Sequence, residues 1–240
     1  MSLSPSLALS VTDLVLRLAD DKFVMGLSLE NWLTKAPNSE IHQVFRRLTR
    51  RYYQHAGAYY QLLDDISNEK FRERTKAKSF RSSQFAAIPL SGYADALIKQ
   101  YLFDQADLIR LENLQYAQYA GLQHLALSFL PQAKVGLEHA QLMISKLAPA
   151  TEDAKKTLQQ ALSNWYPTSF GLFEPTTQTN SLTKAGIQDL EDQLLKRFRA
   201  TVPEFIHTVD LHLPNAKHFF DFFGGRSGHQ RAELTELLKG

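Results

Sequence analysis

The sequence predicts an all-α protein built as a bundle of long helices, and three observations lead to this prediction. Apolar residues recur at spacings of three and four over long stretches, which is the period of an amphipathic helix. Glycine and proline are concentrated at a few break points between these stretches. Neither the alternation of strands and helices typical of a parallel sheet nor an internal repeat of about 20–50 residues is found.

The first helix is expected from Val11 to Leu33, with Thr12 or Asp13 available as its N-terminal cap. Pro37-Asn38-Ser39 then breaks the chain. The apolar stripe of this first helix consists of Leu14, Leu18, Met25, Leu29 and Trp32.

Ser39 is expected to cap a second helix that runs to about Ile66. The charged stretch Glu69–Arg81, in which basic residues outnumber acids, is interpreted as a solvated connection. The stripe of the second helix contains Phe45, Leu48, Tyr52, His55, Tyr59 and Leu62.

Two further long helices are expected at Tyr93–Tyr119 and from Gly121 to about Leu147. Pro131 lies inside the latter and should kink or restart it, because proline lacks a backbone donor. Four long antiparallel helices joined by short breaks predict a bundle.

Shorter elements are expected to follow the four long helices. Thr151 caps a fifth helix towards Trp165, and Pro167 and Pro175 bracket a non-helical crossing segment. The remaining expectations are an amphipathic helix at Ser181–Ala200, a short helix beginning at Pro203, an extended segment at His207–Leu213, and a final helix at His229–Leu238.

Composition excludes several classes of protein. The chain of 240 residues is 44% hydrophobic and 11% aromatic, which is enough to fill a core and excludes disorder. Lys and Arg number 27 against 25 acids, so the net charge is only +2. A charge this small does not favour electrostatic binding to nucleic acid or to an anionic membrane. The absence of cysteine excludes disulfides, thiolate zinc sites, iron–sulfur clusters and cysteine nucleophiles.

The location of the protein is expected to be cytoplasmic. Met1–Ser10 carries no basic region before an apolar run, so it does not read as a secretory signal. No stretch approaches the roughly 18–20 apolar residues of a membrane span.

A helical bundle raises the question of a di-iron site. Such a site takes a Glu from each of two helices and a Glu-x-x-His from each of the other two. The one Glu-x-x-His in the sequence, Glu204–His207, follows Pro203 and lies outside the four long helices. We interpret it as an ordinary amphipathic turn.

Other candidate metal ligands are isolated along the chain. Glu112, Glu138 and His139 could together form a mononuclear iron site, which is the enzymatic alternative. Gln132 and Gly136, however, stand on the stripe of the fourth helix where metal chemistry would need Glu and His. We therefore interpret His139 as a hydrogen-bonded core or interface residue.

The second helix combines arginines with tyrosines, a composition found both at subunit interfaces and in nucleic-acid binding. The balancing acids elsewhere favour an interface, with Arg47, Arg51, Tyr52 and Tyr59 as anchors. Arg51 has no acid at i±3 or i±4 of its helix. On this basis Arg51→Glu is expected to abolish complex formation while leaving the subunit folded.

A glycine-rich loop precedes the expected final helix. Backbone amides and an arginine at a helix N-terminus could bind a phosphate, although a plain flexible turn is the favoured interpretation of this loop. Its candidate residues are Gly224, Gly225, Arg226, Gly228 and His229.

Four segments of the chain, in this order and spread over nearly its whole length, resemble the PaaC family. This family is the non-catalytic, ferritin-like subunit of the phenylacetyl-CoA 1,2-epoxidase complex. The chain departs from it at Arg50–Ala56, which is bulky and basic where the family is apolar and small. The segments are Leu16–Asp21 leading to Leu29–Trp32, Ala94–Asp104, Leu158–Phe173 with Glu174-Pro175, and Leu211–Pro214 followed by Gly224–His229 and Glu233-Leu234.

The resemblance implies a ferritin-like bundle with extra C-terminal helices, forming one domain over 1–240 with a core at about 11–165 and an extension at about 166–240. It also implies a catalytic di-iron oxygenase subunit as partner, which epoxidises phenylacetyl-CoA, and self-association is a further possibility. No catalytic residue, metal or cofactor is expected in this chain, whose role would be to dock and stabilise the partner. No nucleic-acid or membrane partner is expected.

Overall fold

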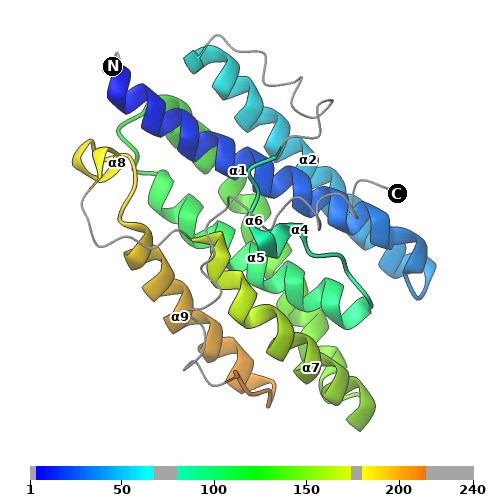
Figure 1. The fold of residues 1–240 in the computed structure, drawn as a ribbon. Helices are drawn as coiled ribbons and strands as arrows, with labels where there is room; N and C mark the ends of the chain where they lie inside the picture. The colour runs from blue at the N-terminus through cyan, green and yellow to red at the C-terminus, as the bar shows by residue number, and fades with distance from the viewer. Residues whose placement is uncertain (1–3, 68–79, 174–179, 215–240) are drawn as a thin grey trace.

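A computed structural model describes residues 4–67, 80–173 and 180–214 of the protein. Over these residues the regular structure is helical throughout, without a strand, so the all-α prediction is confirmed. Helix α1 (Pro5–Trp32) packs along α2 (Ser39–Ser67), and α5 (Tyr93–Leu114) packs along α6 (Ala120–Leu147). These two hairpins form the four-helix bundle (Figure 1).

The other helices cover α5 and the ends of the bundle. Helices α7 (Glu152–Ser169) and α9 (Glu191–Thr208) both pack against α5 (Figure 1). Two short helices, α4 (Gln84–Ala87) and α8 (Ser181–Lys184), contact α1, and single 3-10 turns follow α1 and α7 at Leu33–Lys35 and Phe170–Leu172.

Helix caps differ from the prediction at two of three N-termini. Ser4 caps α1 by accepting the N–H of Leu7, so the helix begins before Thr12 and Asp13. Asn38, rather than Ser39, caps α2, because its Oδ1 accepts the N–H of Ile41 at 2.9 Å. Thr151 caps α7 as predicted and accepts the N–H of Ala154 at 3.0 Å.

Prolines interrupt the helices less than expected. Helix α6 continues through Pro131 as one element, Pro167 lies inside α7, and Pro203 lies inside α9 rather than at the start of a new helix. Proline removes one backbone hydrogen bond, and the apolar residues packed on either side of each proline hold these helices together despite that loss.

Three other boundaries were predicted wrongly. The third long helix ends at Leu114, five residues early, and the expected helix at 181–200 is divided into α8 and α9. The segment 207–213 is not extended: it contains the end of α9 and a turn at Asp210, which has a positive φ of 53°.

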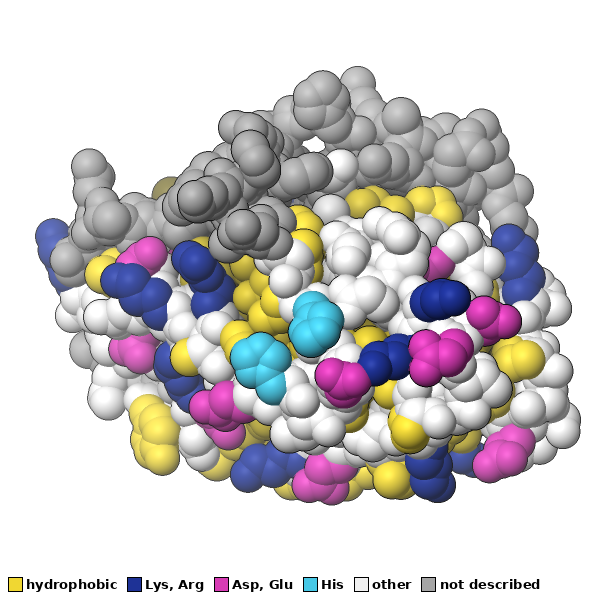
Figure 2. Space-filling model, turned by 90° about the horizontal axis from the view of Figure 1, so that it is seen from below, with side chains coloured by type: hydrophobic (Ala, Val, Ile, Leu, Met, Phe, Trp, Pro, Cys, Tyr) yellow, Lys and Arg dark blue, Asp and Glu magenta, His cyan; other side chains and the backbone are white. Residues whose placement is uncertain are grey.

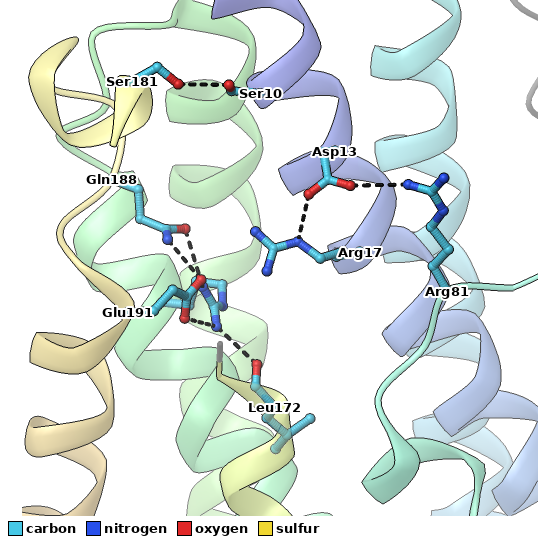
Figure 3. Close-up of polar contacts among 9 residues, drawn as sticks. Ser10, Asp13, Arg17, Arg81, Leu172, Ser181, Gln188 and Glu191 are labelled. Carbon is cyan, nitrogen blue, oxygen red and sulfur yellow. Dashed lines mark hydrogen bonds and ion pairs between the residues drawn. The ribbon is translucent and has the colours of Figure 1, made fainter. Parts of the chain in front are cut away.

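A buried ion pair fixes α9 against α5. Arg110 of α5 donates to both carboxylate oxygens of Glu191, at 2.7 and 3.0 Å, and also to the Leu172 carbonyl at 3.2 Å. Gln188 also donates to Glu191, at 2.9 Å, and Figure 3 shows these two side chains directed toward one another. Burial by itself would raise the pKa of Glu191, but the charge and hydrogen bonds of Arg110, with smaller contributions from Arg17 and Gln188, together outweigh it and lower that pKa. The pair therefore stays ionised and orients α9.

None of the described helices has the length and apolar character needed to cross a bilayer. Lys and Arg side chains alternate with Asp and Glu on the face seen in Figure 2, so no field of one sign develops there. The predicted glycine loop at Gly224–His229 and the final helix lie outside the described residues, as does most of the basic connection 69–81.

Candidate functional site at the centre of the bundle

Helices α2 and α6 face each other, and each carries a histidine. The residue three positions before each of these histidines is not a carboxylate. The pairs are Tyr52 with His55 on α2 and Gly136 with His139 on α6. A di-iron bundle would carry Glu at the first position of each pair, because i and i+3 project from the same face. These two pairs therefore have the spacing of Glu-x-x-His but not its carboxylate.

Asp104 of α5 lies at the centre of this region and is fully buried. Its Oδ1 accepts from Arg51 Nη2 at 2.6 Å and from the Tyr52 hydroxyl at 2.8 Å. Burial raises the pKa of Tyr52 well above its usual value, and the Asp104 charge raises it further, so the phenol remains a donor. Asp104 thus has a protein cation and a protein donor as partners.

Arg51 reaches Asp104 by lying across α6. Its Nη1 donates to the Gln132 carbonyl at 2.8 Å, and only 13% of its side chain is exposed. Burial by itself would lower the pKa of Arg51, but the charge and hydrogen bond of Asp104, with smaller contributions from Tyr52 and Asp107, together outweigh it and raise that pKa. The guanidinium is accordingly a permanent charge inside the bundle.

Gly136 makes the position of Arg51 possible. A Cβ placed on Gly136 would lie 1.8 Å from Arg51 Nη1 and 2.7 Å from its Cζ, far inside van der Waals contact. The guanidinium therefore occupies the volume into which any side chain at position 136 would project. The Arg51 guanidinium thus lies where the side chain of a glutamate at this position of a di-iron bundle would leave the fourth helix.

A second buried cation lies on α1. Lys22, 1% exposed, donates to Asp107 of α5 at 2.6 Å. The neighbouring carboxylates of α1 are also engaged: Asp20 accepts from the Tyr60 hydroxyl and from the backbone N–H of Arg81, and Asp21 accepts from the N–H of Ser83. The interior carboxylates named here are thus all bonded to groups of the chain itself.

These residues do not fit a di-iron centre. Lysine and arginine have no lone pair to offer a metal at their ordinary protonation state, and they repel a dication. Glycine at 136 supplies no side-chain ligand, and position 52 carries a phenol rather than a carboxylate. Among the described residues, no group of three or more His, Asp or Glu side chains is placed to hold a metal ion.

His55 is held neutral in the core. Its ring stacks on Phe129 with centroids 3.8 Å apart, and its Nε2 lies 3.1 Å from Gln132 Oε1, where an Nε2–H donates to the amide. Burial, helped by the charge of Lys22, lowers the pKa of His55 to about 3. The imidazole therefore serves as a packed donor.

This depressed pKa predicts acid sensitivity. Below the unfolded-state pKa of about 6.5 the unfolded chain gains a proton at this histidine and the folded chain does not. Stability is thus complete above about pH 6.5 and falls by up to about 1.4 kcal/mol per pH unit down to about pH 3. In urea titrations from pH 7 to 4, His55→Gln should lose stability less steeply than wild type. The exposed His124→Gln should keep the wild-type slope, and equal slopes for all three proteins would contradict the prediction.

The predicted metal-site alternative is not assembled. Glu112 pairs with Arg197 of α9 at 2.8 Å, whereas Glu138 is exposed and His139 half-buried on α6. Glu204 and His207, the Glu-x-x-His pair, are both exposed on α9. Spacing along the sequence does not predict this separation, because it does not show which neighbouring helix each side chain faces.

The predicted interface anchors are mostly interior residues. Tyr52 and Tyr59 are 0% and 1% exposed, so the chain itself covers them and their assignment as partner anchors is wrong. Arg51 finds its carboxylate on α5 rather than in its own helix, so Arg51→Glu should damage the fold as well as any complex. Of the four, Arg47 alone is exposed.

A cleft opens between α2 and α6 above the Arg51 guanidinium. It has a volume of about 530 Å³, and its walls are mainly apolar. Arg47 and His139 stand among its lining residues, with Gln100 and Arg51 contributing from the interior. The apolar lining consists of Val44, Leu48, Pro131, Val135 and Gly136.

The family model PaaA_PaaC, described as phenylacetic acid catabolic protein, matches residues 7–240. A search of curated proteins finds no match. The matched range includes every helix described above except the first two residues of α1.

Proposed function

This chain belongs to the PaaA_PaaC family of phenylacetic acid catabolic proteins, and from that membership we propose that it is the structural, non-catalytic subunit of a cytoplasmic multicomponent di-iron oxygenase. In this proposal it docks and stabilises a catalytic subunit of the same family, which epoxidises phenylacetyl-CoA. The chain itself carries neither iron nor catalytic residues.

The observation that carries the proposal is the Arg51–Asp104 pair beside Gly136. In a catalytic bundle, interior carboxylates would be neutralised by iron, whereas here a guanidinium neutralises Asp104 and fills the space beside position 136. Lys22 likewise neutralises Asp107, between α1 and α5. Both pairs give the bundle a fixed interior without a metal, as a docking subunit requires.

Iron content tests the proposal directly. The protein is co-expressed with its catalytic partner under aerobic growth with added ferrous iron, and each purified chain is analysed for iron by mass spectrometry. We expect well under one iron per chain of this protein and iron in the partner, because Arg51 and Lys22 repel a dication. Two tightly bound irons per chain of this protein would overturn the proposal.

Activity provides the second measurement. Epoxidation of phenylacetyl-CoA should require both chains, and replacing His139 by Gln should leave turnover unchanged because no chemistry is assigned to this chain. Loss of turnover in a His139→Gln complex that retains its full iron content would contradict a purely structural role.

A further inference from the structure

The cleft between α2 and α6 has a charged end. Arg51 of α2 donates to the Gln132 carbonyl of α6 at 2.8 Å. Leu62, about three turns further along α2, lies against Gly121, about three turns earlier on α6. The two helices therefore run antiparallel, and Arg47, one turn before Arg51, lines the end of the cleft that is nearer the C-terminus of α6.

Arg47 brings to this end a charge that the described residues do not neutralise. It is exposed, and within the described ranges it forms no ion pair. The described residues that line the cleft include no Asp or Glu, and the second arginine among them, Arg51, is already paired with Asp104. The cleft thus has an excess of one positive charge, which suits a single negative charge on a ligand.

The rest of the cleft offers apolar surface. From Arg47 its walls continue over Leu48 of α2 and Val135 of α6 to Pro131. Val135 is 66% exposed, so a molecule lying in the cleft removes apolar surface from water, which favours binding. The volume of about 530 Å³ is within the range of small-molecule sites.

The floor of the cleft holds a polar atom that the chain leaves unpaired over its described residues. Gln100 is 1% exposed, and its Nε2 donates to the Gly136 carbonyl at 3.2 Å, but its Oε1 accepts no hydrogen bond there. Buried polar atoms in native proteins are nearly always paired with protein, water or ligand. This part of the cleft is therefore not a finished core surface.

From this polarity we propose that the cleft binds an apolar monocarboxylic acid of the fatty-acid type. Its carboxylate pairs with Arg47, whose planar fork of N–H donors matches two carboxylate oxygens. Its chain lies along Leu48 and Val135 toward Pro131. The inference goes beyond the proposed function and is independent of it, since it requires neither iron nor a partner subunit.

Calorimetric titration of the purified full chain with decanoate tests the inference. One decanoate should bind per chain. Decanol and decyltrimethylammonium have the same chain without the negative charge, and acetate has the carboxylate without the chain. Each of these three should bind at least about tenfold more weakly than decanoate, because each lacks one of the two contacts.

Arg47→Met should weaken the decanoate Kd about tenfold and leave that of decanol unchanged, because only the carboxylate contact is lost. Arg46→Met is the matched control: Arg46 is the adjacent, exposed arginine, it does not line the cleft, and its loss should leave both affinities unchanged. Thermal unfolding should be the same for both variants, because neither side chain is buried.

A second pair of variants locates the chain of the ligand. Val135→Asp should weaken both decanoate and decanol, because it places a carboxylate on the apolar wall. Leu127→Asp, at a residue of α6 that is 53% exposed and outside the cleft, should weaken neither. Absence of saturable decanoate binding, decanol binding as tight as decanoate binding, or an Arg47→Met protein with wild-type affinity would overturn the inference. Uptake of several decanoates per chain that Val135→Asp does not reduce would likewise overturn it.

Discussion

Replacing Arg51 by methionine is expected to lower the free energy of unfolding by about 3–5 kcal/mol, the usual cost of leaving one charge of a buried pair uncompensated. The carboxylate left behind is that of Asp104, which is fully buried and keeps only the Tyr52 hydroxyl and a distant Gln100 amide as donors. Methionine matches the length of the arginine stem, so the loss reports the charge more than the packing. Urea denaturation at pH 7 gives the measurement.

Two controls separate this effect from general damage to α2. Arg50 is the adjacent, exposed arginine, and Arg50→Met should change stability by no more than about 0.5 kcal/mol. Adding Asp104→Asn to Arg51→Met should recover part of the loss, because the buried charge is removed. A single variant as stable as wild type would show that the pair does not hold the bundle together.

The second large effect is expected at Gly136. Replacing a helical glycine by alanine ordinarily stabilises a helix by roughly 0.5–1 kcal/mol. Here the new Cβ would lie 1.8 Å from Arg51 Nη1, so the guanidinium must shift from its position between the Gln132 carbonyl and Asp104, and we expect the pair with Asp104 to break. The loss of that pair exceeds the gain in helix propensity, and Gly136→Ala should destabilise the protein by about 2–4 kcal/mol.

Gly57 provides the matched control for this prediction. It lies within α2, and a Cβ built on it meets no heavy atom within 4 Å, so Gly57→Ala should stabilise by roughly 0.5–1 kcal/mol. In an Arg51→Met background, where no guanidinium is present, Gly136→Ala should lose its cost. Additive effects of the two substitutions would mean that they act on separate features.

Much of the bundle could be predicted from the sequence because it depends on local signals. The four long apolar stripes gave α1, α2, α5 and α6, and the cap at Thr151 gave the start of α7. Prolines were the main source of error, since a helix interrupted by Pro131, Pro167 or Pro203 is held by contacts with other helices that no local window contains.

The centre of the site was harder to predict for the same reason. Asp104 lies on the apolar stripe of the third long helix, and a lone carboxylate on such a stripe indicates a buried partner. The sequence around Arg51 does not identify it as that partner, because the two residues lie on different helices and Arg51 has no acid at i±3 or i±4 of its own helix. The signal for the pairs ending at His55 and His139 is the histidine itself, one on each of two facing helices, whichever residue stands three positions before it.

The contact between Arg51 and Gly136 also bears on how such a subunit could change over evolutionary time. A glutamate introduced at 136 would create Glu-x-x-His with His139, but its Cβ would lie 1.8 Å from Arg51 Nη1, and a prior loss of Arg51 would leave the Asp104 charge without its cation. Either first step produces a protein destabilised by several kcal/mol, and selection removes most such variants. While this arginine and this glycine are both in place, a metal ligand at 136 is therefore not gained in one step without a loss of stability.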